Sequence, residues 1–250
     1  MFKYNFFTFM VFIALFSCKN GKKPENNKFH ISNFTESTQF PDAAISSMQY
    51  TDGNFVFGLR NYTLGLQTPD APQKMCANSD KGQHIHLLLN DKPYEAKYDS
   101  AFHYFVPDGE HYILGFLSRS YHESIKNKTA FVSMQATIKD SSIVSVKPIT
   151  APMLFYSRPK GNYVGSETEK IMLDFYLLNC ELGSNFKVKA EINGQHEHIF
   201  EKWEPIYLEG LPYGENKIKL SLLDSSGALV NSPLNPIERK FTLTEDPLKK

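Results

Sequence analysis

Residues 82–119 read GQHIHLLLNDKPYEAKYDSAFHYFVPDGEHYILGFLSR, and this stretch decides the fold. It contains a histidine pair on a predicted strand, a turn, a second strand, a Pro-Asp-Gly-Glu-His turn and a third strand. Apolar residues alternate over Ile85 to Leu89 and Tyr112 to Leu117, which is typical of strands that bury one face. Asn-Asp and Pro-Asp-Gly sequences favour tight turns. The stretch therefore predicts an antiparallel β unit.

The outline of this stretch recurs in the second half of the chain. Residues 85–91 align with residues 188–194, and residues 107–110 align with residues 212–215. Ile113 then matches Ile218, and Leu117 matches Leu222, so the anchors keep their order with one short insertion between them. We interpret this as a tandem repeat of one domain type.

Short runs with a period of two continue through the rest of the chain, separated by Gly, Pro, Asn and Asp. No segment sustains the 3.6-residue period of a helix over three turns. This pattern predicts an all-β protein built from two tandem Ig-like β-sandwich domains. The predicted strands outside the quoted stretch are 54–59, 130–138, 171–178, 186–192, 206–208, 217–223 and 239–243.

The N-terminus is predicted to be a targeting segment. One early lysine, Lys3, precedes an apolar run that ends at Phe16, which is typical of a secretory signal. Residues 15–18, Leu-Phe-Ser-Cys, resemble a bacterial lipobox, and this resemblance implies cleavage before Cys18 and lipidation of its thiol. We expect a membrane-anchored lipoprotein of the cell envelope, at the outer membrane by resemblance to known sorting rules.

The expected organisation follows from these signals. Two prolines near residues 148–152 break the strand pattern and mark a domain boundary. The predicted parts are a lipoprotein signal peptide at 1–17, the lipidated cysteine and a flexible tether at 18–33, a first Ig-like domain at 34–148, a second at 149–245, and a loose tail at 246–250.

Charge and motifs exclude several functions. Lys plus Arg total 27, as do Asp plus Glu, so the balance gives no indication of nucleic-acid binding. The sequence lacks the nucleophile elbow, the zincin helix motif and the glycine-rich nucleotide loops. We therefore expect a non-catalytic protein that binds another envelope protein, a peptide or a glycan.

The histidines give an alternative function. His84 and His86 are two residues apart on a predicted strand, so both side chains point to one face. Lys187 and Lys189 occupy the matching positions in the second copy, which indicates a solvated face. With His111 from the neighbouring strand, the pair can form a three-ligand site for Cu or Zn. His103 and His122 are further candidates.

This stretch and three other phrases of the sequence resemble known families. Gly82, His84, His86, residues 87–89 and 91, and the Pro107, Gly109, His111 turn resemble a family of small bacterial envelope domains of unknown function. The phrases APQKMCANS, FLSRSYHESIK and FYSRPKG resemble flavobacterial lipoproteins, some of which are labelled phosphopeptide-binding. Cupins do not fit, because Asn90 and Asp91 stand where that family has a glutamate, and blue-copper proteins do not fit, because the cysteine precedes the histidines.

A third function is binding of an anion or a phosphopeptide. Arginine beside hydroxyl groups can bind a carboxylate or phosphate, and two loops have this composition. If the loops meet at the domain junction, they form a small anion pocket. The residues expected to line it are Ser118, Arg119, Ser120, His122, Arg158 and Lys160. Cys76 and Cys180 fall at near-equivalent places in different copies, so we expect two separate thiols.

Overall fold

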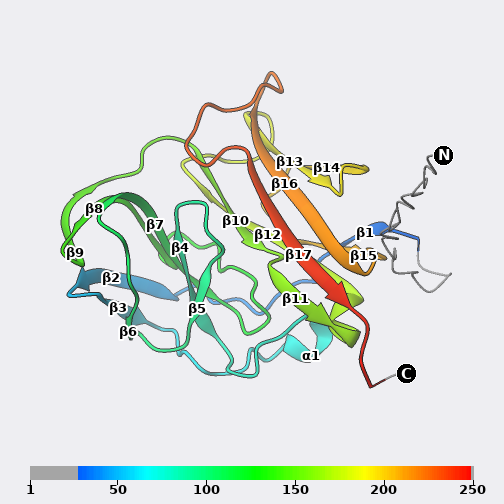
Figure 1. Ribbon diagram of the computed structural model, residues 1–250, viewed down its shortest axis with the longest axis horizontal. Coiled ribbons are helices and arrows are strands. Elements are labelled where there is room, and N and C mark those ends of the chain that lie inside the picture. Colours follow the sequence, from blue (N-terminus) through cyan, green and yellow to red (C-terminus); the bar gives the residue numbers. More distant parts are fainter. Residues whose placement is uncertain (1–27, 249–250) are drawn as a thin grey trace, which may run out of the picture.

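A computed structural model describes residues 28–248 of the chain. The predicted signal peptide and Cys18 lie outside these residues. The described chain forms two β-sandwiches that lie next to each other (Figure 1). No helix within residues 28–248 has both the length and the apolar character needed to cross a bilayer.

The first sandwich consists of a three-stranded and a five-stranded sheet. The smaller sheet contains β2 (Ala44–Thr51), β3 (Asn54–Arg60) and β6 (Ala101–His103) in that order. The larger sheet has the order β5 (Glu95–Lys97), β4 (His84–Leu89), β7 (Gly109–Ser118), β8 (Phe131–Lys139) and β9 (Ser142–Lys147). A short helix, α1 (Ala71–Lys74), lies in the long connection between β3 and β4.

The second sandwich repeats this plan with a four-stranded and a five-stranded sheet. One sheet has the order β1 (His30–Asn33), β15 (Ile206–Glu209), β12 (Lys170–Leu178) and β10 (Met153–Arg158). The other has the order β11 (Gly161–Val164), β17 (Ile237–Thr244), β16 (Gly214–Asp224), β13 (Phe186–Ile192) and β14 (His196–Phe200). A 3-10 turn, η1 (Gly165–Thr168), follows β11.

The strand order confirms the Ig-like prediction. In the second sandwich, β10, β12, β15 and β1 occupy the spatial positions A, B, E and D of an immunoglobulin sheet, and β13, β16 and β17 occupy C, F and G. In the first sandwich, β2, β3 and β6 take positions A, B and E, and β4, β7 and β8 take C, F and G. The aligned stretches of the sequence repeat are therefore the C and F strands of both domains.

One predicted boundary is wrong. Residues 30–33, which were assigned to the flexible tether, form strand β1 and pair antiparallel with β15 of the second sandwich. The pairing satisfies backbone groups at the free edge of β15, and Ser32 also hydrogen-bonds Glu209. The chain therefore begins, within the described residues, on the second sandwich and then crosses to the first.

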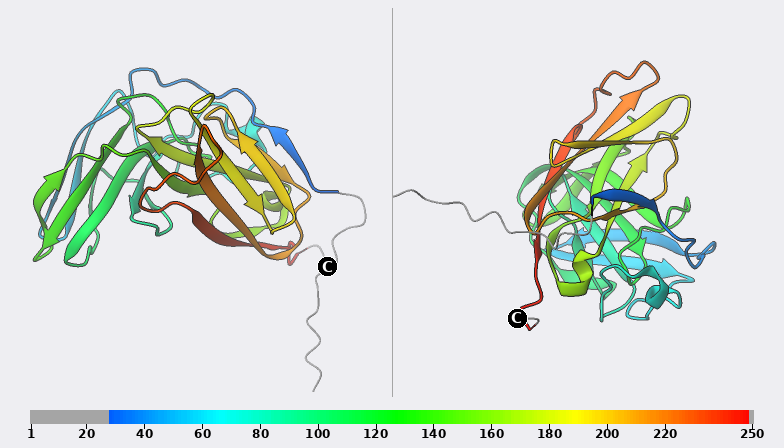
Figure 2. Two further views of the ribbon diagram at one scale, coloured as in Figure 1. Left: turned by 90° about the horizontal axis from the view of Figure 1, so that it is seen from above. Right: turned by 90° about the vertical axis from the view of Figure 1, so that its right-hand side faces the viewer.

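The two sandwiches are joined by a dedicated apolar layer. Each has its own core, and a third cluster unites Leu88, Leu114 and Phe116 of the first domain with Phe155 and Tyr176 of the second. The outer face of the β4–β7 sheet thus packs against the outer face of the β10–β12 sheet (Figure 2). This packing buries β4, β10 and β12 on both faces.

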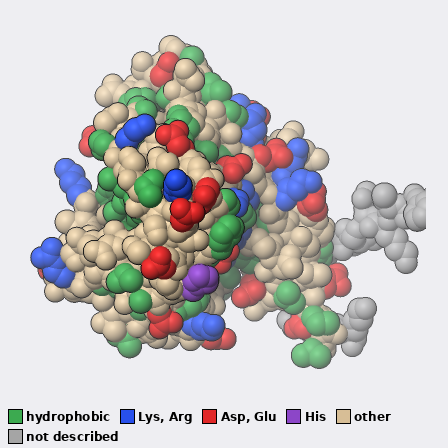
Figure 3. Space-filling view, turned by 60° about the vertical axis from the view of Figure 1, so that its left-hand side comes forward, with side chains coloured by type: hydrophobic (Ala, Val, Ile, Leu, Met, Phe, Trp, Pro, Cys, Tyr) green, Lys and Arg blue, Asp and Glu red, His purple; other side chains and the backbone are tan. Residues whose placement is uncertain are grey.

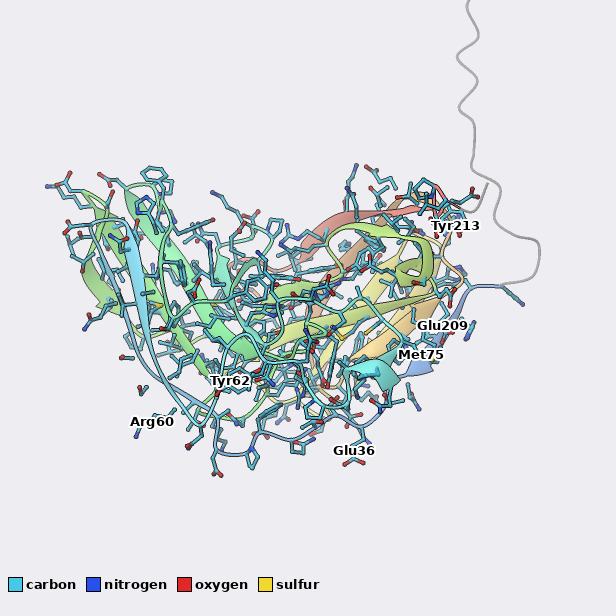
Figure 4. All side chains as sticks on the ribbon, turned by 90° about the horizontal axis from the view of Figure 1, so that it is seen from below. Glu36, Arg60, Tyr62, Met75, Glu209 and Tyr213 are labelled. Atoms are coloured by element: carbon cyan, nitrogen blue, oxygen red, sulfur yellow. The ribbon has the colours of Figure 1, made fainter. Side chains whose placement is uncertain are left out.

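A second contact between the domains lies at α1. The hydroxyl of Tyr207 on β15 donates a hydrogen bond of 2.8 Å to the backbone carbonyl of Lys74. Figure 4 labels Met75 and Glu209, which mark where this helix meets that strand. On the surface, acidic and basic side chains are interspersed on the face shown in Figure 3.

Candidate metal site at the domain junction

The histidine pair lies at the domain junction. His84 and His86 are both 0% exposed, although the sequence comparison predicted a solvated face. That prediction is wrong because the second sandwich covers this face of β4, and Leu88 on the same face joins the apolar layer. The matching lysines of β13, 187 and 189, remain partly exposed and pair with surface glutamates.

A third histidine reaches the pair from the loop that follows β7. The backbone N–H of His122 donates to the carbonyl of Arg119 at 2.9 Å and closes a tight turn. His122 has a φ of +70°, a conformation that residues other than glycine rarely adopt and that costs energy. The turn places its ring 4.8 Å from the ring centre of His84.

Three ring nitrogens converge in this cluster. Nε2 of His84 lies 2.9 Å from Nε2 of His86 and 3.0 Å from Nδ1 of His122. The ligand atoms of the three residues all lie within 4.8 Å of one another. Zn–N bonds of 2.0–2.1 Å place tetrahedral ligand atoms about 3.3 Å apart. The spacing therefore fits one transition-metal ion after small side-chain shifts.

The Nδ1 atoms of His84 and His86 face away from the cluster, and their hydrogen-bond partners orient these two rings. Nδ1 of His84 donates to the carbonyl of Gly82 at 2.8 Å, which leaves the lone pair of Nε2 facing the cluster. Nδ1 of His86 lies 3.3 Å from the hydroxyl of Ser157 on β10. A carbonyl or hydroxyl behind each ring is the usual support of metal-binding histidines.

Gly82 has a specific role in this support. Its φ is +79°, and a Cβ there would lie 2.5 Å from the carbonyl oxygen of Leu66. Only glycine fits this position without displacing the backbone. The first glycine of the Gly-x-His-x-His motif thus allows the chain to turn its carbonyl toward His84.

Burial keeps the three imidazoles neutral. It lowers the pKa of His84 to about 4, and the positive charges of Arg158 and Lys160 act in the same direction. Burial also holds the pKa of His86 and that of His122 well below the ordinary value. Neutral rings present lone pairs, and the lone pair of His84 Nε2 cannot accept good hydrogen bonds from two neighbours at once. The donor set therefore suits a cation.

An open pocket of about 290 Å³ lies beside the cluster. His122 lines it, whereas the side chains of His84 and His86 are buried beneath. The hydroxyl of Tyr94 lies 3.3 Å from Nδ1 of His122, and its ring stacks on His86 with centroids 3.6 Å apart. Arg158 and Lys160 also line the pocket.

His111 lies outside the cluster, contrary to the predicted ligand set. Its Nε2 donates to the carbonyl of Pro107 at 2.8 Å, and its Nδ1 accepts from the amide of Asn90 at 3.0 Å. In the second domain Asn216 makes the same two bonds, to Pro212 and Asn193, each at 2.8 Å. His111 therefore holds a turn that both copies share.

This equivalence gives a testable prediction. We expect His111→Asn to keep the stability and the metal content of the protein, because asparagine satisfies the same groups in the second copy. We expect His111→Ala to cost about 1–2 kcal/mol, because it removes two part-buried hydrogen bonds, to Asn90 and Pro107. Urea unfolding and metal analysis of both variants measure these effects. Loss of metal in the asparagine variant would contradict the assignment.

The residues of the predicted anion pocket separate into two groups. Arg119 directs its donors to the carbonyls of Thr38 and Ser124 and lines a different pocket, so it does not meet Arg158. Ser118 and Ser120 are buried and bonded within their own domain. Only His122, Arg158 and Lys160 share the pocket beside the cluster. Cys76 and Cys180 are free thiols, as expected.

The fold and the cluster define a class of protein: a tandem Ig-like β-sandwich chain with a buried three-histidine site between its domains. No protein-family model matches the sequence, and a comparison with curated proteins found no match.

Among solved structures, the chain is similar to fibronectin(III)-like modules of CbhA from Clostridium thermocellum. That match has 16% identity and a TM-score of 0.29, and it covers 38% of this chain and 99% of that one. A second match is the extracellular domain of a protein described as a hybrid two-component system from B. thetaiotaomicron. It has 10% identity and a TM-score of 0.27, and it covers 80% of this chain but only 37% of that one.

Proposed function

We propose that this protein is a non-catalytic binding module of the cell envelope, anchored through a lipid on Cys18, whose ligand is a copper or zinc ion held by His84, His86 and His122. The observation that carries the metal assignment is the convergence of ring nitrogens from three neutral histidines. Two of these histidines, His84 and His86, are held from behind through Nδ1. The anchor rests on the lipobox resemblance alone.

The chemistry of the ligands favours Zn²⁺ or copper over Mg²⁺ and Ca²⁺. Imidazole suits zinc and copper, whereas magnesium and calcium prefer oxygen ligands. Three protein ligands would leave a fourth coordination position for another group, and an open pocket lies beside His122. Among residues 28–248, no carboxylate hydrogen-bonds any of the three rings.

The test is the metal content of the purified full-length chain. After loading with Zn²⁺ or Cu²⁺ and dialysis against metal-free buffer, we expect one equivalent of metal per chain. His122→Gln removes a metal ligand on a half-buried loop. We expect it to weaken metal binding by at least about 100-fold, because even the residues that only support a ligand typically contribute about 10–100-fold.

The matched control is His103→Gln, because His103 is exposed and lies outside the cluster. This variant is expected to retain one equivalent of metal. Retention of metal by His122→Gln with wild-type affinity, or failure of the wild-type chain to hold either metal, contradicts the proposal. Comparison of the zinc and copper affinities of the wild type identifies the metal.

A further inference from the structure

The pocket beside the histidines contains a buried positive charge without an acidic partner. Arg158 is 6% exposed, and its two terminal nitrogens donate to the hydroxyls of Tyr94 and Tyr163, each at 2.8 Å. Its Nε is buried and has no hydrogen-bond partner among the described residues. Within residues 28–248, no carboxylate lies within 4.0 Å of this guanidinium.

Such an arrangement is unusual for arginine. The guanidinium stays protonated at all physiological pH values, and buried charges are normally paired. Neutral phenols satisfy part of its hydrogen-bonding capacity but supply no negative charge. The only other buried arginine among the described residues, Arg119, contacts Glu123 at 3.4 Å. Arg158 therefore lacks the counter-charge that the second arginine has.

A second positive charge lies on the same pocket. The ammonium of Lys160 lies 4.0 Å from the centre of the Tyr94 ring and donates to the backbone carbonyl of Tyr94 at 2.5 Å. Desolvation lowers the pKa of Lys160, while nearby Glu95 opposes this change and Arg158 adds to it. Glu167 also lines the pocket and is the acidic residue on its wall.

These charges have a consequence for the metal site. Two positive side chains beside three neutral imidazoles repel a divalent cation, and a bound cation would add further positive charge to a partly desolvated region. An anion in the fourth coordination position removes this repulsion. Tyr94 connects the two parts, because its hydroxyl contacts both His122 and Arg158.

We propose that the pocket binds the oxyanion of a small carboxylate or phosphate, with Arg158 and Lys160 holding the oxyanion beside the metal ion at His84, His86 and His122. This inference rests on the proposed metal function. The guanidinium retains unused N–H groups for an oxyanion, and the ammonium of Lys160 supplies a second charged donor. Binding of metal and binding of anion are then coupled, and each strengthens the other by the same factor.

The experiment uses the full-length chain loaded with Co²⁺, whose visible absorption reports its coordination. The Co²⁺ protein is titrated with acetate and, in a separate arm, with inorganic phosphate, at constant ionic strength maintained with NaCl. We expect both oxyanions to change the absorption, and chloride to have no such effect. The oxyanion with the lower dissociation constant shows whether the pocket prefers a carboxylate or a phosphate. Each is also expected to raise the affinity for Co²⁺.

Two variants test the residues. Lys160→Gln is expected to retain Co²⁺ and to weaken oxyanion binding by about tenfold or more, the effect of losing one charged hydrogen bond. Arg158→Gln should weaken oxyanion binding further than Lys160→Gln does. Because Arg158 is buried, circular dichroism is used to verify that the variant protein folds. The control is Lys240→Gln, since Lys240 on β17 is exposed, pairs with Glu215 and does not line the pocket.

The outcomes separate the two proposals. If Co²⁺ binds but neither oxyanion changes its absorption, or if Lys160→Gln binds both oxyanions as tightly as the wild type, the oxyanion inference is wrong and the metal function stands. If the wild-type chain binds no Co²⁺, Zn²⁺ or copper, the metal function is wrong and the coupled inference is overturned with it.

Discussion

Asp174→Ala is expected to destabilise the protein by about 3 kcal/mol or more, the range for removing one partner of a buried ion pair. Asp174 lies on β12 of the second domain and is 1% exposed. One carboxylate oxygen accepts from Lys126 at 2.8 Å, and the other accepts from the backbone N–H of Ser124 at 2.9 Å. Alanine removes the counter-charge of the ammonium, which keeps only its bond to the Ser124 hydroxyl, and leaves this N–H without its acceptor at the domain junction.

The same substitution is expected to weaken metal binding. Ser124 and Lys126 belong to the loop that carries His122, so Asp174 anchors this loop to the second domain. Without this anchor, the loop can leave the strained backbone conformation at His122, and the His122 ring then no longer lies against His84. We expect the loss of affinity to lie in the range of about 10–100-fold that is known for residues behind metal ligands.

Urea unfolding of the metal-free protein and a metal competition assay measure the two effects. Glu215→Gln is the control, because the Glu215–Lys240 pair has a similar length, 2.9 Å, but is exposed. Exposed pairs contribute little, so this variant should leave the stability almost unchanged. Equal effects of the two substitutions would show that the junction pair does not anchor the loop.

The sequence predicted the strands and the repeat because both depend on local patterns. The alternation of apolar and polar residues predicted β3, β4, β7 and β13. The tight turns predicted at Asn90 and Asn193 are confirmed, and both asparagines have positive φ. The same-face arrangement of His84 and His86 also followed from the strand period alone. These features require no knowledge of what packs against the sheet.

The burial of the histidine face could not be derived from the repeat, because it depends on the neighbouring domain. The first domain has a second sandwich against β4, whereas no described residue covers the matching lysines of β13 in that way. A signal was present in the sequence: residues 87–89 are a continuous apolar run, which is typical of a strand buried on both faces. The histidines share that strand.

The identity of the third histidine could not be read from spacing. His111 and His122 both follow the pair within one domain, and His111 has the simpler place at a strand start. The structure selects His122 through a left-handed backbone conformation and a turn that no composition rule requires. Repeat comparison offers a partial guide, because Asn216 at the position of His111 indicates a hydrogen-bonding role that asparagine can also fill.

The metal-free protein is expected to lose stability steeply as the pH falls from about 6.5 to about 4. Burial is the main cause of the low pKa values of His84, His86 and His122, and the neighbouring rings, Arg158 and Lys160 add to it. In the unfolded chain each histidine has an ordinary pKa near 6.5. Below this pH the unfolded state binds more protons than the folded state, so acid favours unfolding.

The size of the effect follows from the shift at His84. A pKa lowered from 6.5 to about 4 corresponds to about 3 kcal/mol of stability, which is fully present above pH 6.5 and fully lost below pH 4. The other two histidines act in the same direction, although protonation of one raises the cost of protonating the next. The total loss is therefore at least as large as the contribution of His84.

His86→Phe separates this effect from the titration of carboxylates. Phenylalanine keeps a ring to stack on Tyr94 but carries no proton, so the fall in stability between pH 6.5 and pH 4.5 should be smaller in the variant. Urea unfolding in chelator-treated buffer at pH 7.5, 5.5 and 4.5 measures the difference. Parallel curves for the two proteins would show that the cluster does not titrate on unfolding. A smaller slope in the variant would instead tie the acid sensitivity to the three rings, because a surface histidine has the same pKa in both states.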